Sequence, residues 1–354
     1  MPDDVLRRIA EDPGIGRILR ATSTGMRGLV DASARSIHLR LPPPWHPQDG
    51  PSDLLARLVG LREVKVDPRC GAEGLGELAR STAFDRLETL DLSGCTWLVD
   101  LAALSGCVGL RSLILSDFRF SDISPLAACT ALKLLDMSMC SKLSKFGICP
   151  ALETLVITWC TAKIDVRSIA PVATLKYLET SCSIGDLAVL ADFTNLRGLN
   201  LKDRAIADIG PLARCTSLQR LTLSFCKKIQ DLGPLAACTA LQHLDLSNCF
   251  GVRDTGVLAN LTGLRHLDLR NCTAIQDVGG LAACTALRYL DLSGCGKIKD
   301  IGPLSACTAL QHLNIARCRN IEDVSLLFAL LIKKSRDVGH HRTVRHNPSV
   351  PRTA

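Results

Sequence analysis

Histidines and aspartates recur at a fixed spacing in the second half of the chain. His243 and His266 each stand two residues before an aspartate, and both pairs are separated by the same interval of 23 residues. General-base catalysis and metal binding both use a histidine that is held by a carboxylate. Whether such chemistry is available here depends on how the fold positions these side chains.

The interval belongs to a repeated phrase that starts with a leucine. LQHLDLSNC begins at Leu241, and related phrases follow at Leu264, Leu287 and Leu310. A fixed period of this size indicates a stacked solenoid, because one unit cannot bury its own apolar face. Within each unit the apolar positions one, four and six, counted from the leading leucine, predict a short strand with one buried face. Twelve units align on this pattern, with leading residues Leu61, Leu87, Leu110, Leu132, Leu152, Leu175, Leu196, Leu218, Leu241, Leu264, Leu287 and Leu310.

This L-x-x-L-x-L pattern resembles the leucine-rich repeat family over about residues 61–332. The resemblance implies an α/β fold, a right-handed solenoid (horseshoe) with a parallel β-sheet on its concave face. The second half of the units, as in DIGPLARC at residues 208–215, resembles internalin-type proteins and repeat proteins of trypanosomatid parasites. Proline in this half, as at Pro125 and Pro211, predicts brief 3₁₀ or one-turn helical segments on the convex side.

The resemblance implies that positions two, three, five, seven and eight point outward from the concave sheet. An open sheet offers no water-excluded pocket, so we expect a protein partner on this face, and neither enzymatic activity nor a cofactor or metal. The predicted partner-binding residues at positions three and five are Arg220, His243, Asp245, His266, Asp268, Tyr289, Asp291 and His312.

Position eight supplies a second set of candidates. Met139, Trp159 and Phe225 stand where other units carry Gly94, Asn248, Asn271 or Arg317. Exposed Met and aromatic side chains are typical interface anchors, which would place all three at the rim of the concave face. The alternative is that the irregular units in the middle of the array turn them inward.

Cysteines follow the same register. Of 17 cysteines, fifteen stand either at position nine or three residues before the next leading leucine, and only Cys70 and Cys182 do not. A free cysteine that is buried behaves as a small hydrophobic residue. The sequence has no C-x-x-C pair, so we interpret these thiols as core packing in a reducing compartment.

The segment before the array has helical apolar spacing and resembles an F-box, a module that docks on the Skp1-type adaptor of cullin ubiquitin ligases. Met1 and Met26 replace a leucine and the tryptophan of that pattern. The alternative is an N-terminal cap that covers the edge of the first strand. The residues that carry the resemblance, and hence the predicted adaptor-docking residues, are Pro2, Val5, Leu6, Ile9, Ile18, Leu19, Met26 and Leu29.

Composition and charge complete the expected organisation. The net charge is +7, but residues 333–354 hold six Lys or Arg against one acid, so the body is close to neutral and no nucleic-acid partner is expected. We expect a helical F-box-like module or cap at 1–40, a Pro-rich linker at 41–57, the solenoid at 58–332 and a disordered basic tail at 333–354. The longest apolar run is too short for a membrane span, and no signal peptide is recognisable.

These features predict a cytoplasmic or nuclear protein–protein interaction solenoid that is monomeric outside its complexes. The first hypothesis is a substrate-recognition adaptor of an SCF-type (Skp1–cullin–F-box) E3 ubiquitin ligase. The alternative is a stand-alone scaffold or regulatory binding protein of the internalin-like or trypanosomatid type, without a role in ubiquitin transfer.

Overall fold

The computed structural model describes residues 17–20, 36–40, 61–66, 68, 84–140, 142–160, 165–171, 173–181 and 187–323. The chain divides into two compact units. Unit 1 comprises residues 1–175 and 182–184, and unit 2 comprises residues 176–181 and 185–354. The division falls among the irregular repeats in the middle of the array.

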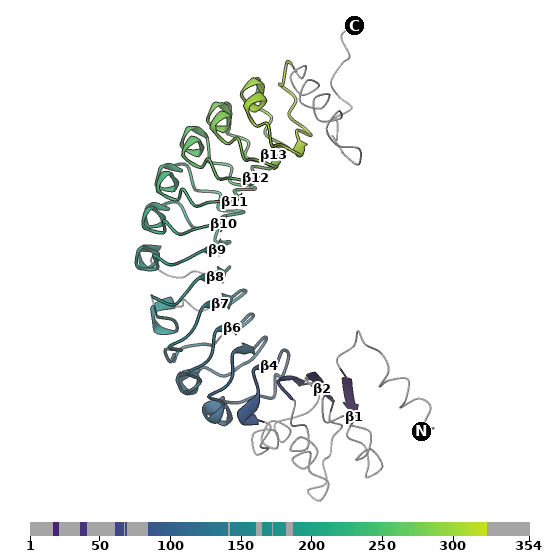
Figure 1. Cartoon of the computed structure of the whole chain (residues 1–354), viewed down its shortest axis with the longest axis vertical. Coiled ribbons are helices and arrows are strands. Elements are labelled where there is room, and N and C mark those ends of the chain that lie inside the picture. The colour runs from purple at the N-terminus through teal and green to yellow at the C-terminus, as the bar shows by residue number, and fades with distance from the viewer. Residues whose placement is uncertain are drawn as a thin grey trace, which may run out of the picture. The chain divides into compact units, whose positions relative to one another are not determined.

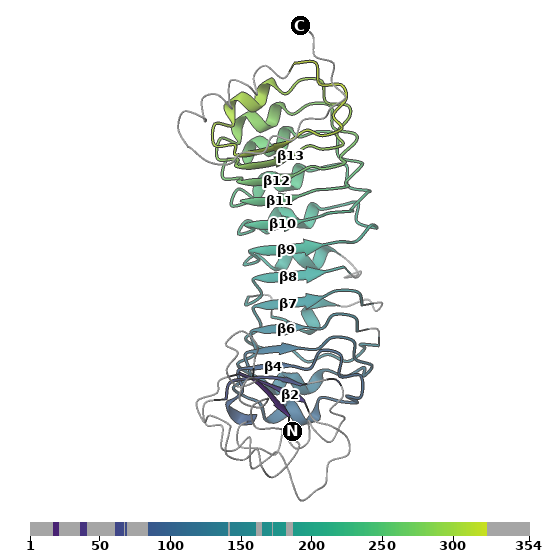
Figure 2. The same cartoon turned by 90° about the vertical axis from the view of Figure 1, so that its right-hand side faces the viewer.

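Each unit is built on parallel strands that follow one another in chain order (Figures 1 and 2). In unit 1 the strands are β1 (Arg17–Arg20), β2 (Ser36–Arg40), β3 (Glu63–Val66), β4 (Thr89–Asp91), β5 (Ser112–Ile114), β6 (Leu134–Asp136) and β7 (Thr154–Ile157). In unit 2 they are β8 (Tyr177–Thr180), β9 (Gly198–Leu201), β10 (Arg220–Thr222), β11 (His243–Asp245), β12 (His266–Asp268), β13 (Tyr289–Asp291) and β14 (His312–Asn314). The predicted parallel sheet with one strand per repeat is confirmed.

Short 3₁₀ helices return the chain on the side opposite the strands. In unit 1 they are η4 (Phe84–Arg86), η5 (Ala102–Gly106), η6 (Ser124–Ala128) and η7 (Val166–Ser168). In unit 2 they are η8 (Leu187–Asp192), η9 (Gly210–Arg214), η10 (Gly233–Ala237), η11 (Gly256–Asn260), η12 (Gly279–Ala283) and η13 (Gly302–Ala306). Proline occupies the first turn of η6, η9, η10 and η13, where its missing N–H is not needed.

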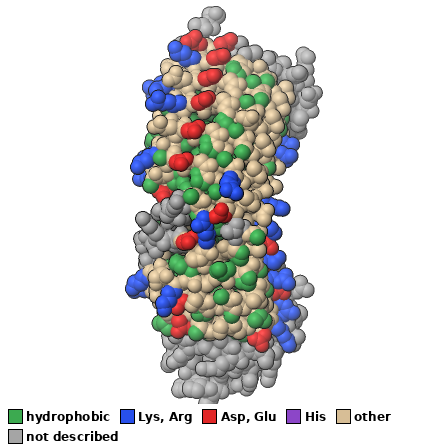
Figure 3. All heavy atoms as spheres, turned by 90° about the vertical axis from the view of Figure 1, so that its left-hand side faces the viewer, with side chains coloured by type: hydrophobic (Ala, Val, Ile, Leu, Met, Phe, Trp, Pro, Cys, Tyr) green, Lys and Arg blue, Asp and Glu red, His purple; other side chains and the backbone are tan. Residues whose placement is uncertain are grey.

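The aspartate before each of the 3₁₀ helices η9 to η13 holds the start of that helix. The Asp208 carboxylate accepts a hydrogen bond from the Gly210 amide at 2.7 Å, and Asp254 accepts one from Gly256 at 2.7 Å. The same contact repeats from η9 to η13, so a row of exposed carboxylates runs along the 3₁₀ side of unit 2 (Figure 3). Its members are Asp208, Asp231, Asp254, Asp277 and Asp300.

The core between strands and 3₁₀ helices is mainly aliphatic, with Phe84 and Phe193 as its largest fully buried side chains, and the two cysteine ladders lie inside it. All fifteen ladder cysteines are buried and free, as predicted. The thiols also donate hydrogen bonds to the preceding repeat, which packing alone did not predict. Cys272 Sγ lies 3.1 Å from the Leu246 carbonyl oxygen, and Cys284 Sγ lies 3.3 Å from that of Leu258.

The helix predicted to contain Ile18 and Leu19 is wrong. Residues Arg17–Arg20 form β1, which pairs in parallel with residues 37–40 of β2, and β2 in turn pairs with β3. The spacing of Ile18 and Leu19 suits a short strand as well as a helix, and the free edge of a sheet favours strand pairing. The other proposed docking residues, Pro2, Val5, Leu6, Ile9, Met26 and Leu29, lie outside the described residues, as do 41–57 and 333–354.

Candidate functional site

Position three forms a column of stacked rings across four strands of unit 2. His243, His266, Tyr289 and His312 are direct partners in the strand register, and we call them the ring column. The His243 and His266 ring centroids are 4.0 Å apart with planes 9° from parallel, and those of His266 and Tyr289 are 4.2 Å apart at 5°. His312 is tilted by 43° at 6.1 Å from Tyr289. The faces of the inner rings therefore cover one another, and their edges remain for solvent or a partner.

The imidazoles of this column favour the neutral form. Burial lowers the pKa of His243, and the positive charges of His266 and Arg220 lower it further, while Asp245 opposes them. Burial also lowers the pKa of His266, against the attraction of Asp245 and Asp291. A neutral imidazole offers one N–H donor and one acceptor at its edge, so the column can form hydrogen bonds without carrying charge at neutral pH.

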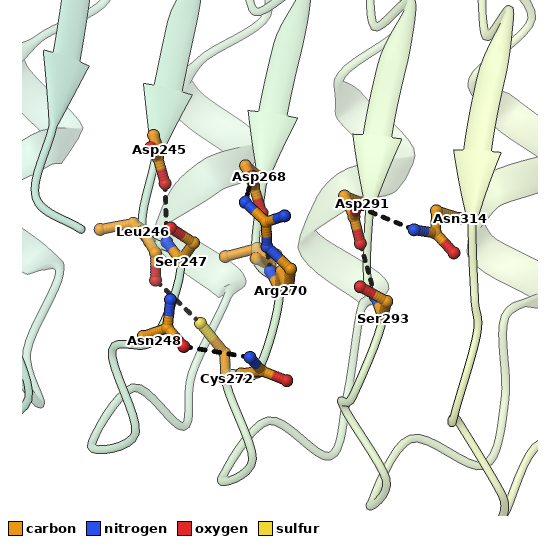
Figure 4. A network of polar contacts seen from close by, with 12 residues as sticks. Asp245, Leu246, Ser247, Asn248, Asp268, Arg270, Cys272, Asp291, Ser293 and Asn314 are labelled. Atoms are coloured by element: carbon orange, nitrogen blue, oxygen red, sulfur yellow. Dashed lines mark hydrogen bonds and ion pairs between the residues drawn. The ribbon is translucent and has the colours of Figure 1, made fainter. Parts of the chain in front are cut away.

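The carboxylates at position five accept hydrogen bonds from backbone amides of their own repeats. Asp245 accepts from the Ser247 amide at 2.8 Å, Asp268 from Arg270 at 2.9 Å and Asp291 from Ser293 at 2.8 Å (Figure 4). Each bond satisfies an N–H where the strand ends and the ladder stops.

Two of these carboxylates are withdrawn from solvent. Asp268 is 7% exposed and Asp291 is 3% exposed, and their place among the partner-binding residues stays a prediction. Asp268 forms an ion pair with Arg270 at 3.0 Å, and Asp291 accepts a hydrogen bond from Asn314 Nδ2 at 2.9 Å (Figure 4). Burial raises the pKa of Asp268, and the neighbouring charges of Asp245 and Asp291 raise it further, against the Arg270 amide and guanidinium.

The exposed charges on the strand side of unit 2 are positive. We define this strand side as positions two to eight of its repeats: residues 176–181, 197–203, 219–225, 242–248, 265–271, 288–294 and 311–317. Among the Asp and Glu side chains of these residues, Glu179, Asp203 and Asp245 are half-buried and Asp268 and Asp291 are buried. The exposed cations are Arg197, Lys202, Arg220, Arg265, Arg270, Arg288 and Arg317, of which Arg270 is paired with Asp268. Apart from Arg220, these cations were not among the predicted site residues, because the sequence does not show which charges are buried.

The arginines at position two stand beside the ring column. The Arg265 and His266 amides both donate to the Gln242 carbonyl, at 2.8 and 3.0 Å, and the Arg288 and Tyr289 amides both donate to the Arg265 carbonyl. Two successive residues therefore face one acceptor at the start of each strand. Strand alternation is interrupted there, which leaves the side chains of positions two and three outside the core.

Position eight adopts a left-handed backbone conformation in most repeats. Its φ is 63° at Met139, 59° at Trp159 and 66° at Phe225. The turn requires this conformation, because the Met139 amide donates to Thr158 at 2.7 Å before the chain turns inward to the cysteine at position nine. Glycine and asparagine tolerate positive φ best, and they occupy the slot at Gly94, Asn248, Asn271 and Gly294.

The three large apolar residues at position eight are exposed. Met139 is 54% exposed, Trp159 77% and Phe225 45%, so the structure favours the rim placement over the inward alternative. Met139 and Trp159 belong to consecutive repeats of unit 1. In unit 2, Phe225 lies one residue from Cys226, and the Lys227 ammonium that follows lies 5.1 Å from the centre of the half-exposed Phe250 ring.

Near the start of unit 2, an aromatic ring at position three lies against a glycine. A Cβ atom added to Gly198 would lie 2.6 Å from Tyr177 Cδ1. Gly198 therefore makes room for the Tyr177 ring across β9, and Arg220 follows on β10 in the same register.

The described residues contain no group of three or more His, Cys, Asp and Glu side chains arranged to hold a metal ion. Within that same part of the chain, the helices are all too short or too polar to cross a membrane.

Comparison with known families agrees with the repeat architecture. A family model described as Leucine Rich repeats (2 copies) matches residues 194–237 and 285–328, and one described as Leucine Rich repeat matches residues 261–282. No curated protein sequence is similar enough to this chain to count as a match.

Solved structures share the fold. An internalin from Listeria monocytogenes is 26% identical, with a TM-score of 0.52, over 74% of this chain and 82% of its own. A leucine-rich repeat protein of Leptospira interrogans is 14% identical, with a TM-score of 0.61, over 91% of both chains. A TLR13–ssRNA13 complex is 17% identical, with a TM-score of 0.55, over 89% of this chain and 58% of that protein.

Proposed function

We propose that this leucine-rich repeat protein is a scaffold that binds a protein partner and performs no bond chemistry itself. The observation that carries the proposal is the presence of Met139, Trp159 and Phe225 at position eight, where the backbone is left-handed and the side chain is exposed.

These side chains are unfavourable for the isolated chain. A left-handed conformation costs a residue with a Cβ roughly 1–2 kcal/mol, whereas glycine pays almost none of it. Trp159 remains 77% exposed, so burial within the chain offsets little of that cost. Large apolar side chains at such a place are explained by contact with another protein, where Trp, Met and Phe are preferred anchors.

A double substitution of the rim tests the proposal. Met139→Gly with Trp159→Gly relieves the backbone strain, so we expect an equal or higher melting temperature together with loss of the protein partner recovered by affinity purification of the wild type. Asp117→Gly is the matched control, because Asp117 is an exposed residue at the same position of a neighbouring repeat with a φ of 60°. Partner recovery that survives the double substitution would overturn the assignment of the rim.

Two biological roles are proposed for such a scaffold. One is substrate recognition in a cullin-type ubiquitin ligase, through a Skp1-type adaptor held by the N-terminal segment, and the other is a stand-alone binding protein. Size-exclusion chromatography of the purified full chain with a purified Skp1-type adaptor separates them. Co-elution supports the ligase role, and separate elution at micromolar concentrations leaves the stand-alone scaffold. We propose a monomer with a cytoplasmic or nuclear location in either role.

A further inference from the structure

We propose that the strand side of unit 2 binds an acidic segment of a partner protein, one rich in Asp and Glu. This inference rests on the proposed function as a protein-binding scaffold, and it names the chemistry of the partner.

The first argument is the sign of the accessible charge. Seven Lys or Arg side chains on this side are exposed, whereas the Asp and Glu side chains among the same residues are half-buried or buried. Of the seven, Arg270 is paired with Asp268. The aspartates at position five accept hydrogen bonds from backbone amides of their own repeats, and Asp268 and Asp291 are buried. A partner therefore meets more positive than negative charge on this side.

The second argument is the contrast with the 3₁₀ side of the same unit. That side carries the exposed row from Asp208 to Asp300 (Figure 3). Each of these aspartates caps a 3₁₀ helix, so their positions are fixed by the fold. An acidic partner is repelled from the 3₁₀ side and attracted to the strand side, which orients its approach.

The third argument is the geometry of the donors. Arg265 and Arg288 immediately precede the neighbouring parallel strands β12 and β13, and such strands lie about 4.8 Å apart. A guanidinium group binds a carboxylate through two parallel N–H donors, and an imidazole edge can donate one more. Arg220 stands at one end of this series, in register with His243. Carboxylates spaced along an extended segment can thus be bound one repeat after another.

The ring column favours an acidic protein segment over single-stranded nucleic acid as the partner. Binding of single strands relies on aromatic faces on which bases stack. Here the faces of His266 are covered on both sides, by His243 and by Tyr289. The column offers edges with hydrogen-bonding groups, which suit carboxylates better than bases.

The experiment measures binding of a fluorescein-labelled Glu-rich peptide to the purified full chain by fluorescence anisotropy. A Gln peptide of equal length and a single-stranded oligoribonucleotide of equal charge are the comparison probes. Arg265→Gln with Arg288→Gln is the test variant. Arg253→Gln with Lys299→Gln is the matched control, because both of these cations are exposed but lie outside the strand side.

We expect the Glu peptide to bind and the Gln peptide not to bind, with an affinity that falls as salt is raised. The test variant should lose about tenfold or more in affinity, while the control variant stays within about twofold of the wild type. Absence of Glu-peptide binding overturns the inference. So does an equal loss in both variants, which would indicate non-specific attraction to the net charge, and so does no loss in either, which would place binding on other cations. Tighter binding of the oligoribonucleotide than of the peptide assigns the surface to nucleic acid instead.

These outcomes are independent of the rim experiment. A partner lost on substitution of Met139 and Trp159, together with no Glu-peptide binding, removes this inference and keeps the proposed function. The reverse result removes the rim assignment and keeps the acidic-segment site.

Discussion

His243 and His266 lie ring on ring across strands β11 and β12, with centroids 4.0 Å apart and planes within 9° of parallel. Parallel pairing without a register shift places the same repeat position side by side on neighbouring strands. Aromatic rings at that position in successive repeats can therefore stack. The stack buries one face of each imidazole, and burial lowers the pKa of both.

The stack predicts that acid destabilises unit 2. The pKa values of His243 and His266 are lower in the folded chain than the ordinary value of about 6.5, so the unfolded chain binds more protons once the pH falls through that value. The free energy of unfolding, measured by urea titration, should therefore decrease between about pH 7.5 and about pH 5.5. His243→Gln with His266→Gln removes both groups and should make this decrease smaller.

Asp268 works in the opposite direction, because its raised pKa favours proton uptake by the folded chain at acidic pH. An identical pH dependence in the wild type and in the double His variant would contradict the assignment to the stacked imidazoles.

The buried carboxylates predict unequal effects of two substitutions. Asp291→Ala removes the acceptor for both the Ser293 amide and Asn314 Nδ2, and should lower the free energy of unfolding by about 1–3 kcal/mol. Asp268→Asn keeps an oxygen for the Arg270 amide and removes a buried charge, so we expect a change below about 1 kcal/mol at neutral pH. Urea titration of both variants measures the difference, and equal losses would show that the charge of Asp268 stabilises the fold.

The contact between Tyr177 and Gly198 predicts a pair of coupled substitutions. Gly198→Ala places a Cβ where Tyr177 Cδ1 now lies, and should cost roughly 1–2 kcal/mol. In a Tyr177→Ala background the same change has room and should cost little. The double-mutant cycle gives the coupling energy directly, and additive effects would mean that the ring does not lie across β9.

The ladder thiols should be chemically inert until unit 2 unfolds. Burial raises the pKa of Cys249 to about 12 and that of Cys295 to about 12, and thiolate is the reactive form. We expect alkylation of these residues, followed by peptide mass spectrometry, to show unfolding-limited rates, whereas a cysteine in a short control peptide reacts at once. Rapid labelling of Cys249 in native buffer would contradict its burial.

Most of the fold could be predicted because the same residue types recur at the same positions of each repeat. The leucines at positions one, four and six are buried except Leu313 of the last repeat, and proline and aspartate mark the start of the 3₁₀ helices. Fifteen cysteines were correctly assigned to the core from register alone. The repeat pattern does not extend to Ile18 and Leu19. A short apolar cluster there fits a helix or a strand, and pairing with β2 at the edge of the sheet favours the strand.

The candidate surface was harder to predict because sequence gives charge but not accessibility. Asp268 and Asp291 read as exposed acids on an outward position, yet a free amide two residues further on turns each carboxylate toward the backbone. Nothing in the sequence distinguishes Arg265 and Arg288 from the other arginines. They contribute to the positive charge of the surface because Asp268 and Asp291 are buried. Exposure of Met139 and Trp159 also required the backbone φ of each turn.

The thiol hydrogen bonds have a mechanical consequence. Each runs from one repeat of unit 2 to the one before it, as from Cys295 to Leu269 and from Cys318 to Leu292, each 26 residues earlier. These hydrogen bonds thus connect each repeat only to the repeat before it. Under a pulling force applied to its end, unit 2 should lengthen by release of one repeat at a time, in steps of roughly 80 Å for about 23 residues of extended chain.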